Sequence, residues 1–134
     1  MILKNCLIVG FGGAAGSMLR YLVALVTTQV TPASQLPIAT SIVNLVGCFL
    51  IGGALAFFER YSHLSPELRL LFVTGVLGGF TTFSTFAAEV VGLHRGGMTF
   101  MALIHIALQV GVGVLLVMLG YWLVQRVTCS VLQY

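Results

Sequence analysis

Four long apolar stretches, separated by short polar segments, dominate the pattern along the chain. Each stretch comes close to the roughly 20 residues that an α-helix needs to cross the hydrocarbon core of a bilayer. The segments between them carry helix-start and turn residues, such as Ser65-Pro66-Glu67 and Gly96-Gly97. We therefore predict a single all-α membrane domain with spans at about residues 6–28, 36–58, 68–93 and 99–124.

Composition supports the membrane class. The 134-residue chain is 59% hydrophobic and 7% charged, whereas about a quarter of the residues in a soluble domain are charged. Four spans of roughly 20 to 25 residues and three short loops account for the whole chain, so we expect no separate soluble domain. Its six Lys and Arg residues are too few and too scattered for nucleic acid to be a partner. The apolar run from Met1 to Thr28 is too long for a secretory signal and contains Arg20, so we expect an uncleaved first span.

The distribution of cations bears on orientation. An even number of spans places both ends of the chain on one side of the membrane. Only Arg95 falls on the other side, whereas four cations fall on the side of the ends: Lys4, Arg60, Arg69 and Arg126. Cytoplasmic loops carry an excess of Lys and Arg, so the distribution favours cytoplasmic ends. The excess is small, and both orientations stay under consideration.

Small residues recur at four-residue spacing, which lets helix backbones approach closely in a membrane. The pairs are Gly12 and Gly16, Cys48 and Gly52, Gly75 and Gly79, and Gly92 and Gly96. Sixteen glycines imply tight helix contact on several faces. Four spans alone have too few inward faces to bury so much small and polar surface. We therefore expect a homo-oligomer with its site at the subunit interface.

The third span is weakest at its centre, where good helix formers give way to glycines and hydroxyl residues. The stretch contains Gly75, Gly78, Gly79, Thr81 and Thr82. An unpaired polar group in hydrocarbon costs several kcal/mol, so this stretch must face protein, water or an ion. We expect a break near the middle of the span that frees carbonyls for a cation and N–H groups for an anion, with Thr82, Ser84 or Thr85 as the new N-cap. The alternative is an unbroken, flexible helix whose hydroxyls bond to the preceding turn.

Aromatic and amide side chains near this stretch suit an anion. Phe83 and Phe86 share a helix face, and the positive edges of their rings can approach an anion, although core packing is the ordinary role of such a pair. Asn44, after Thr40 and Ser41 in the second span, offers two N–H donors. The alternative for Asn44 is an interhelical hydrogen bond worth about 0.6 kcal/mol in membranes.

The ionisable candidates are fewer. Arg20 either reaches the membrane interface or attracts anions into a vestibule. Glu89 could pair with a cation or close the polar track, but its charge opposes an anion path unless it is paired or protonated. His105 and Gln109 lie one turn apart, and His105 either serves a function within the membrane or reaches the interface.

The sequence contains no machinery for catalysis. It has no Asp, and we find no Ser-His-Asp set, cysteine pair, acidic metal cluster or phosphate loop. We interpret Cys6, Cys48 and Cys129 as small buried packing residues rather than a disulfide framework or metal ligands.

With these residues in view, the chain resembles the Fluc/CrcB fluoride channels, small bacterial membrane proteins of four spans. Three motifs carry the resemblance: Gly12-Gly13-Ala14-Ala15-Gly16 leading to Arg20-Tyr21, Thr40-Ser41-Ile42-Val43-Asn44 leading to Gly47, and Gly75 through the Thr81-Thr82-Phe83-Ser84-Thr85-Phe86 block. The resemblance implies a passive, fluoride-selective channel of the bacterial inner membrane that protects against fluoride toxicity. It also implies an antiparallel, dual-topology dimer with two pores, each lined by both subunits.

The resemblance implies roles for individual residues. Phe83, Phe86 and Asn44 match the pore aromatics and the pore amide, and Thr82, Ser84 and Thr85 fall in the hydroxyl-bearing region. Backbone carbonyls of Gly78 and Thr81, two from each subunit, match a structural Na⁺ site on the dimer dyad, and Arg20 matches a vestibule arginine. The remaining candidates for the pore lining are Thr40, Glu89, His105 and Gln109. The fourth span departs from the family, because His105, Gln109 and Gly113 stand where a hydroxyl track is usual.

Other functions are weighed against this one. Some members of the family pair two different, oppositely oriented chains, which makes one half of a heterodimeric channel an alternative. A proton-coupled small multidrug-type transporter also has four spans, but it needs a membrane carboxylate, and spans one and two here contain no acid. A third alternative is a membrane assembly subunit that transports nothing.

Overall fold

The computed structural model describes residues 1–31 and 36–131, the last three without their side chains. These residues form helices and the turns between them. In chain order the helices are α1 (Ile2–Val30), α2 (Ile38–Arg60), α3 (Pro66–Arg69), η1 (Leu70–Leu77), α4 (Gly78–Phe80), α5 (Phe83–Arg95), α6 (Thr99–Ala107), η2 (Leu108–Val112) and α7 (Gly113–Val131). The segments η1 and η2 are wound as π-helix and continue their neighbours.

Four helical stretches are long and apolar enough to cross a membrane: Ile2–Val30, Ile38–Arg60, Pro66–Arg95 and Thr99–Thr128. The predicted all-helical class with four membrane-spanning segments is therefore confirmed. The helices extend a few residues beyond the apolar stretches, because helical hydrogen bonding continues through polar ends. At one such end Ser65 caps α3 by accepting the Leu68 N–H at 3.4 Å, with Pro66 in the first turn.

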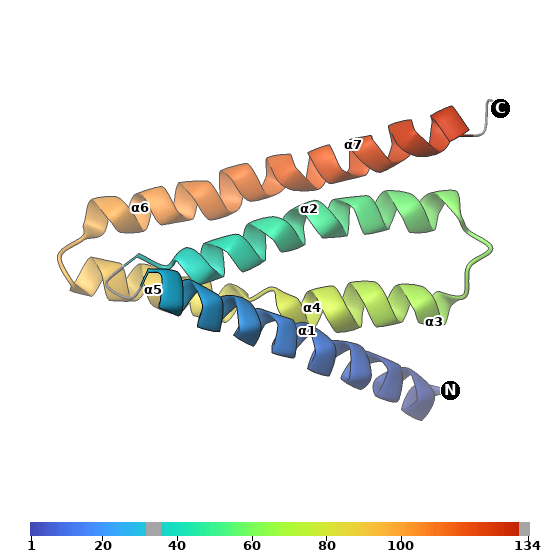
Figure 1. Cartoon of the computed structure of the whole chain (residues 1–134), viewed down its shortest axis with the longest axis horizontal. Coiled ribbons are helices and arrows are strands. Elements are labelled where there is room, and N and C mark those ends of the chain that lie inside the picture. Colours follow the sequence, from blue (N-terminus) through green and yellow to red (C-terminus); the bar gives the residue numbers. More distant parts are fainter. Residues whose placement is uncertain (32–35, 132–134) are drawn as a thin grey trace.

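The four stretches run alternately in opposite directions, so the start of α1 and the end of α7 lie at the same end of the molecule (Figure 1). This agrees with the prediction from an even number of spans. Two exposed polar contacts join neighbouring stretches at that end. Lys4 Nζ lies 2.9 Å from Glu67 Oε1, and the Tyr121 hydroxyl donates to Glu59 Oε2 at 2.6 Å.

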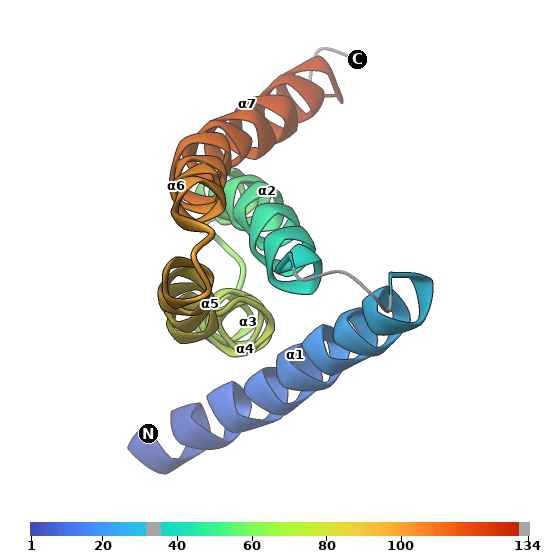
Figure 2. The same cartoon turned by 90° about the vertical axis from the view of Figure 1, so that its left-hand side faces the viewer.

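The helix α1 crosses the first half of the third span with backbone against backbone. Gly12 and Gly16 are buried, and a Cβ at Gly16 would overlap the carbonyl oxygen of Val76 and lie 2.7 Å from the Phe80 nitrogen. A Cβ at Gly79 would lie 2.5 Å from the carbonyl oxygen of Gly13. Two predicted small-residue pairs thus meet each other, and α1 crosses its neighbour obliquely while reaching away from the other helices (Figure 2).

A second contact of this kind joins α2 to α7. Gly52 lies against the carbonyl of Val117, and Gly120 lies against the carbonyl of Phe49, so a Cβ at either glycine would overlap backbone. The sequence spacing identified Gly52, but Gly120 stands alone in the sequence and was missed.

Two packing predictions are not met within the single chain. A Cβ at Gly92 would have no neighbour within 4 Å, so the pair of Gly92 and Gly96 packs no helices together among the described residues; Gly92 lies on an exposed face, and Gly96 ends α5. Cys6 is exposed and Cys48 half-buried. Cys6 lies about 120° around α1 from the buried Gly12 and so faces away from η1. The Cys129 side chain lies outside the described residues.

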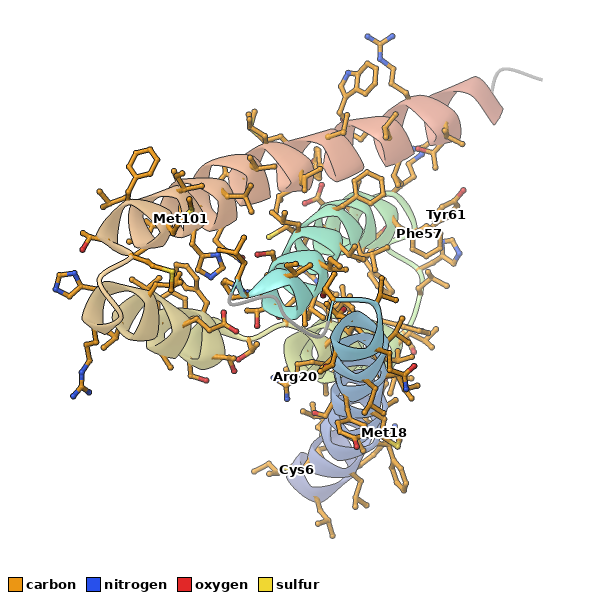
Figure 3. All side chains as sticks on the ribbon, turned by 60° about the vertical axis from the view of Figure 1, so that its left-hand side comes forward. Cys6, Met18, Arg20, Phe57, Tyr61 and Met101 are labelled. Atoms are coloured by element: carbon orange, nitrogen blue, oxygen red, sulfur yellow. The ribbon has the colours of Figure 1, made fainter. Side chains whose placement is uncertain are left out.

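The chain buries few large side chains by itself. Among the described residues the buried apolar side chains are Val43, Ala56, Leu77, Phe80, Phe86, Leu93 and Ala102. Apolar side chains project from all four membrane-spanning stretches, Met18 and Met101 among them (Figure 3). Lipid and protein neighbours are as apolar as these side chains, so close backbone contact rather than hydrophobic burial holds the helices together.

The backbone contacts of α1 predict a sharp difference between two of its glycines. Gly16→Ala forces a methyl group into backbone, so we expect a loss of about 2 kcal/mol in the free energy of unfolding in detergent. In the control Gly10→Ala the methyl group meets no atom within 4 Å. Because alanine is the better helix former by about 1 kcal/mol, the control should equal or exceed the parent in stability. Equal stability of the two variants would contradict the crossing.

Candidate functional site

The site is built around two residues with extended backbone inside the third span. The helix α4 ends at Phe80 and α5 begins at Phe83. Between them Thr81 has φ −81° and ψ 159°, and Thr82 has φ −150° and ψ 118°. The sequence favours this departure here, because Gly78 and Gly79 precede two threonines that lose side-chain freedom in a helix.

The hydroxyl groups at this point hold the two flanking helix ends. The Thr81 N–H and hydroxyl both donate to the Leu77 carbonyl at 3.0 Å, which closes the last turn before the extended residues. The Thr82 hydroxyl oxygen accepts the Thr85 N–H at 3.3 Å and so caps α5. Of the three predicted capping residues, the structure therefore uses Thr82. Ser84 is exposed, with its hydroxyl 3.5 Å from that of Thr82.

Asn44 of α2 binds the extended backbone through both ends of its amide. Its Nδ2 donates to the Thr82 carbonyl at 3.0 Å, and its Oδ1 accepts the Thr82 N–H at 2.8 Å. In an uninterrupted α-helix this N–H would serve the carbonyl of Gly78. The interhelical bond considered for Asn44 therefore exists, and it replaces a helical bond. One Nδ2 hydrogen suffices for Thr82, which leaves the second as a donor for another acceptor.

Two cavities meet at Thr82. The first, of about 320 Å³, has among its lining residues Asn44, Gly78, Thr82, Phe83, Phe86 and Gln109. The second, of about 370 Å³, has among its lining residues Ser17, Arg20, Thr40, Thr82 and Thr85. Arg20 reaches this second cavity from α1, beside the third span (Figure 3). The structure thus gathers most of the candidate residues around the extended backbone.

The two aromatic candidates differ in their surroundings. Their ring centroids are 5.7 Å apart, but Phe83 is 78% exposed and Phe86 is 8% exposed. Phe86 packs between α5 and α6, with its ring centroid 5.2 Å from that of His105. Phe83 therefore presents its ring outward beside the first cavity, whereas Phe86 belongs to the interior.

The half-buried Glu89 and the buried His105 lie together next to Phe86. The Thr40 hydroxyl donates to Glu89 Oε1 at 2.5 Å, and Glu89 Oε2 lies 3.4 Å from His105 Nε2. His105 is 6% exposed, so its ring lies inside the helix bundle. Gln109, one turn later, places its Nε2 3.4 Å from the Ser41 hydroxyl of α2. His105 thus faces Phe86 and Glu89 of α5, whereas Gln109 reaches Ser41 of α2.

Sequence reasoning missed two contributors. Ser17 donates its hydroxyl to the Gly79 carbonyl at 3.5 Å, and a Cβ at Gly47 would overlap the Thr81 methyl group. Ser17 lies three residues before Arg20, on the same helix face, and this spacing could have revealed it. Gly47 belongs to one of the sequence motifs. Its role in making room for Thr81 depends on a contact between two helices that the sequence does not reveal.

The site offers backbone oxygen rather than side-chain ligands for a cation. Among the side chains that the structure describes, no three His, Cys, Asp or Glu residues lie close enough to hold a metal ion. The carbonyl of Gly78 lacks its usual N–H partner, since that N–H donates to Asn44. Backbone carbonyls at interrupted membrane helices are suited to cations.

Known proteins resemble this chain along most of its length. A family model described as "CrcB-like protein, Camphor Resistance (CrcB)" matches residues 7–121. The chain is similar to the fluoride-specific ion channel FluC of Ralstonia pickettii (strain 12J), with 46% identity over 119 residues that cover 89% of this chain and 93% of the relative. It is also similar to fluoride-specific ion channel FluC 1 of Yersinia pestis, with 47% identity over 123 residues that cover 92% and 95% of the two chains.

The pairing of Asn44 with Thr82 predicts a specific stability loss. Asn44→Leu keeps the side-chain volume but removes two hydrogen bonds, so we expect the free energy of unfolding to fall by about 2 kcal/mol. Gln109→Leu removes only the longer contact to Ser41 and should cost about 0.5 kcal/mol. Titration of the purified protein from mild detergent into sodium dodecyl sulfate would measure both. A loss at Asn44 no larger than at Gln109 would show that the amide does not support the extended backbone.

Proposed function

The chain belongs to the CrcB-like family, and from this we propose that it is a passive channel that carries fluoride out of the bacterial cytoplasm. It is a multi-pass membrane protein and an ion channel rather than an enzyme. The observation that carries the proposal is the near-complete overlap with channels named for fluoride, which includes every residue around Thr82. We place the protein in the bacterial inner membrane.

The residues around Thr82 have the chemistry that a dehydrated small anion needs. Fluoride holds water strongly, so a selective path must supply hydrogen-bond donors in place of that water. The second Nδ2 hydrogen of Asn44, the hydroxyl of Thr85, and the ring edges of Phe83 and Phe86 are such groups. The Thr82 hydroxyl donates to that of Thr85 at 2.9 Å, which leaves the Thr85 hydrogen as the donor of this pair. Arg20 in the second cavity raises the local concentration of anions before they enter.

The direction of flow follows from the membrane potential. Hydrogen fluoride crosses bilayers as a neutral molecule and ionises in the more alkaline cytoplasm, where the anion is trapped. A potential that is negative inside favours exit of the anion by about 2.3 kcal/mol per 100 mV. A passive channel therefore lowers cytoplasmic fluoride without an energy source and protects the cell against its toxicity.

We infer that two copies assemble antiparallel, with two pores that each draw residues from both subunits. The support is the outward ring of Phe83, which is 78% exposed beside the first cavity, and the exposed Gly78 next to it. A second copy would cover both. The excess of Lys and Arg at one end of the molecule favours one orientation, so pairing with a homologous chain of opposite orientation is the alternative.

We propose further that the carbonyls of Gly78 and Thr81 hold a structural Na⁺ between the two copies. The residues fit this ion. The Gly78 carbonyl is deprived of its helical N–H, and the extended backbone of Thr81 turns its carbonyl out of the helical ladder. A bound Na⁺ would supply positive charge that offsets these carbonyl dipoles and those of the partner.

The proposed function predicts fluoride efflux from liposomes that contain the purified protein. With valinomycin and potassium present to cancel the voltage, a fluoride electrode should record efflux far above that of protein-free vesicles. Chloride-loaded vesicles serve as the selectivity control. Absence of efflux from well-folded protein, alone and after addition of a homologous chain, would overturn the channel. Proton flux that depends on a cationic drug would favour the multidrug-type alternative.

A second prediction concerns Phe83. Because its ring is mostly exposed within one chain, Phe83→Ala should leave the fold intact, yet removing the ring from the path should slow fluoride efflux by about tenfold. Phe100, which is 71% exposed on α6, provides the matched control. Phe100→Ala should keep full efflux. Equal efflux in the two variants would place Phe83 against lipid instead of the pore.

A further inference from the structure

We propose that Glu89 and His105 share one proton, and that His105 is a positioning residue whose charge neutralises the Glu89 carboxylate beside the anion path. The inference rests on the proposed fluoride channel. A carboxylate next to such a path repels the ion, so the protonation of this pair would set how fast fluoride passes. Fluoride flux should then depend on pH through His105.

The contacts of the Glu89 carboxylate support a shared proton. Its Oε1 already accepts the Thr40 hydroxyl at 2.5 Å. Its Oε2 and His105 Nε2 are both buried and, among the described atoms, have no hydrogen-bond partner apart from their own 3.4 Å approach. Two buried polar atoms that face each other at this distance are satisfied when one proton lies between them. The pair carries no net charge when His105 Nδ1 keeps a hydrogen of its own while this proton lies between Nε2 and Oε2.

The position of the pair connects it to the path. The His105 ring packs against Phe86, which lines the first cavity, and Thr40 lines the second cavity together with Arg20. An ion that moves past Phe86 therefore passes within one side chain of the pair. In this low-dielectric setting a single uncompensated charge acts strongly on another.

Other titratable groups near the pair are few, which makes His105 the natural proton carrier. On α5 the further ones are His94 and Arg95, both exposed, with His94 Nδ1 3.1 Å from the Thr99 hydroxyl. The helix α2 contributes the neutral Thr40 and Ser41 to this region, and η2 contributes the neutral Gln109. From α1 the cation is Arg20, across the second cavity.

The variants separate the charge of Glu89 from the presence of its side chain. In His105→Gln the carboxylate loses its proton partner, so fluoride efflux at about pH 7 should fall by about tenfold. In the double variant Glu89→Gln with His105→Gln no charge remains, and efflux should recover and stay constant with pH. The exposed His94→Gln is the matched control and should behave like the parent.

The experiment is fluoride efflux from liposomes between about pH 6 and pH 9, a range that spans the titration of histidine. The leak of protein-free vesicles is subtracted at each pH. Parent efflux should decline as pH rises, because the shared proton is lost and the carboxylate becomes uncompensated. A pH profile in His105→Gln that matches the parent, or no recovery in a well-folded double variant, would overturn the proposal.

A second readout does not require transport. Infrared difference spectra of the parent across the same pH range should show one carboxylate band that shifts when the pair loses its proton. The band should be missing in Glu89→Gln and should move its midpoint in His105→Gln. If the parent carries no fluoride but shows this coupled titration, the shared proton is supported and the proposed channel function is rejected. If it carries fluoride without the coupled titration, the shared proton is rejected and the channel function is retained.

Discussion

The hydrogen bonds between Asn44 and the backbone of Thr82 are the interaction on which the site depends. A helix in hydrocarbon satisfies its own backbone, and any interruption must find replacement partners within the protein. Asn44, on a neighbouring helix, accepts the Thr82 N–H in place of the helical carbonyl and also donates to the Thr82 carbonyl. This arrangement keeps Thr81 and Thr82 extended at small cost and fixes where α5 starts. The positions of Thr85, Phe83 and Phe86 all follow from that start.

Close backbone contact brings Asn44 and Thr82 within reach of each other. Gly47, one turn after Asn44 on α2, makes room for the Thr81 methyl group. On the other side Gly16 and Gly79 bring α1 against the end of α4, so that Ser17 and Arg20 face the same region. The glycines therefore serve the site as much as the fold, since larger residues would move whole helices away from the extended backbone.

The fold class and the region of the site could be predicted from the sequence, because both depend on properties of neighbouring residues along the chain. Apolar length predicts the four helices, and weak helix formers mark residues 78–82, where the structure has two extended residues. The sequence did not reveal that His105 is the partner of Glu89. It also did not show whether Asn44 donates to an anion or forms an interhelical hydrogen bond. Those depend on the rotation of helices about their axes, which spacing alone does not determine. Gly92, which meets no neighbour within the chain, is a further case, since glycine spacing does not tell which face meets a neighbour.

The two halves of the third span belong to different neighbours. Ahead of Thr81, η1 and α4 lie along α1, whereas α5 packs on α6 after the tight turn at Gly97, whose φ is +80°. The first half of the third span is thus bound to α1 and the second half to α6, and Asn44 of α2 holds the extended residues between them. A change in the tilt of α1 would therefore act first on the residues that precede Thr81, because these are the residues that lie along α1.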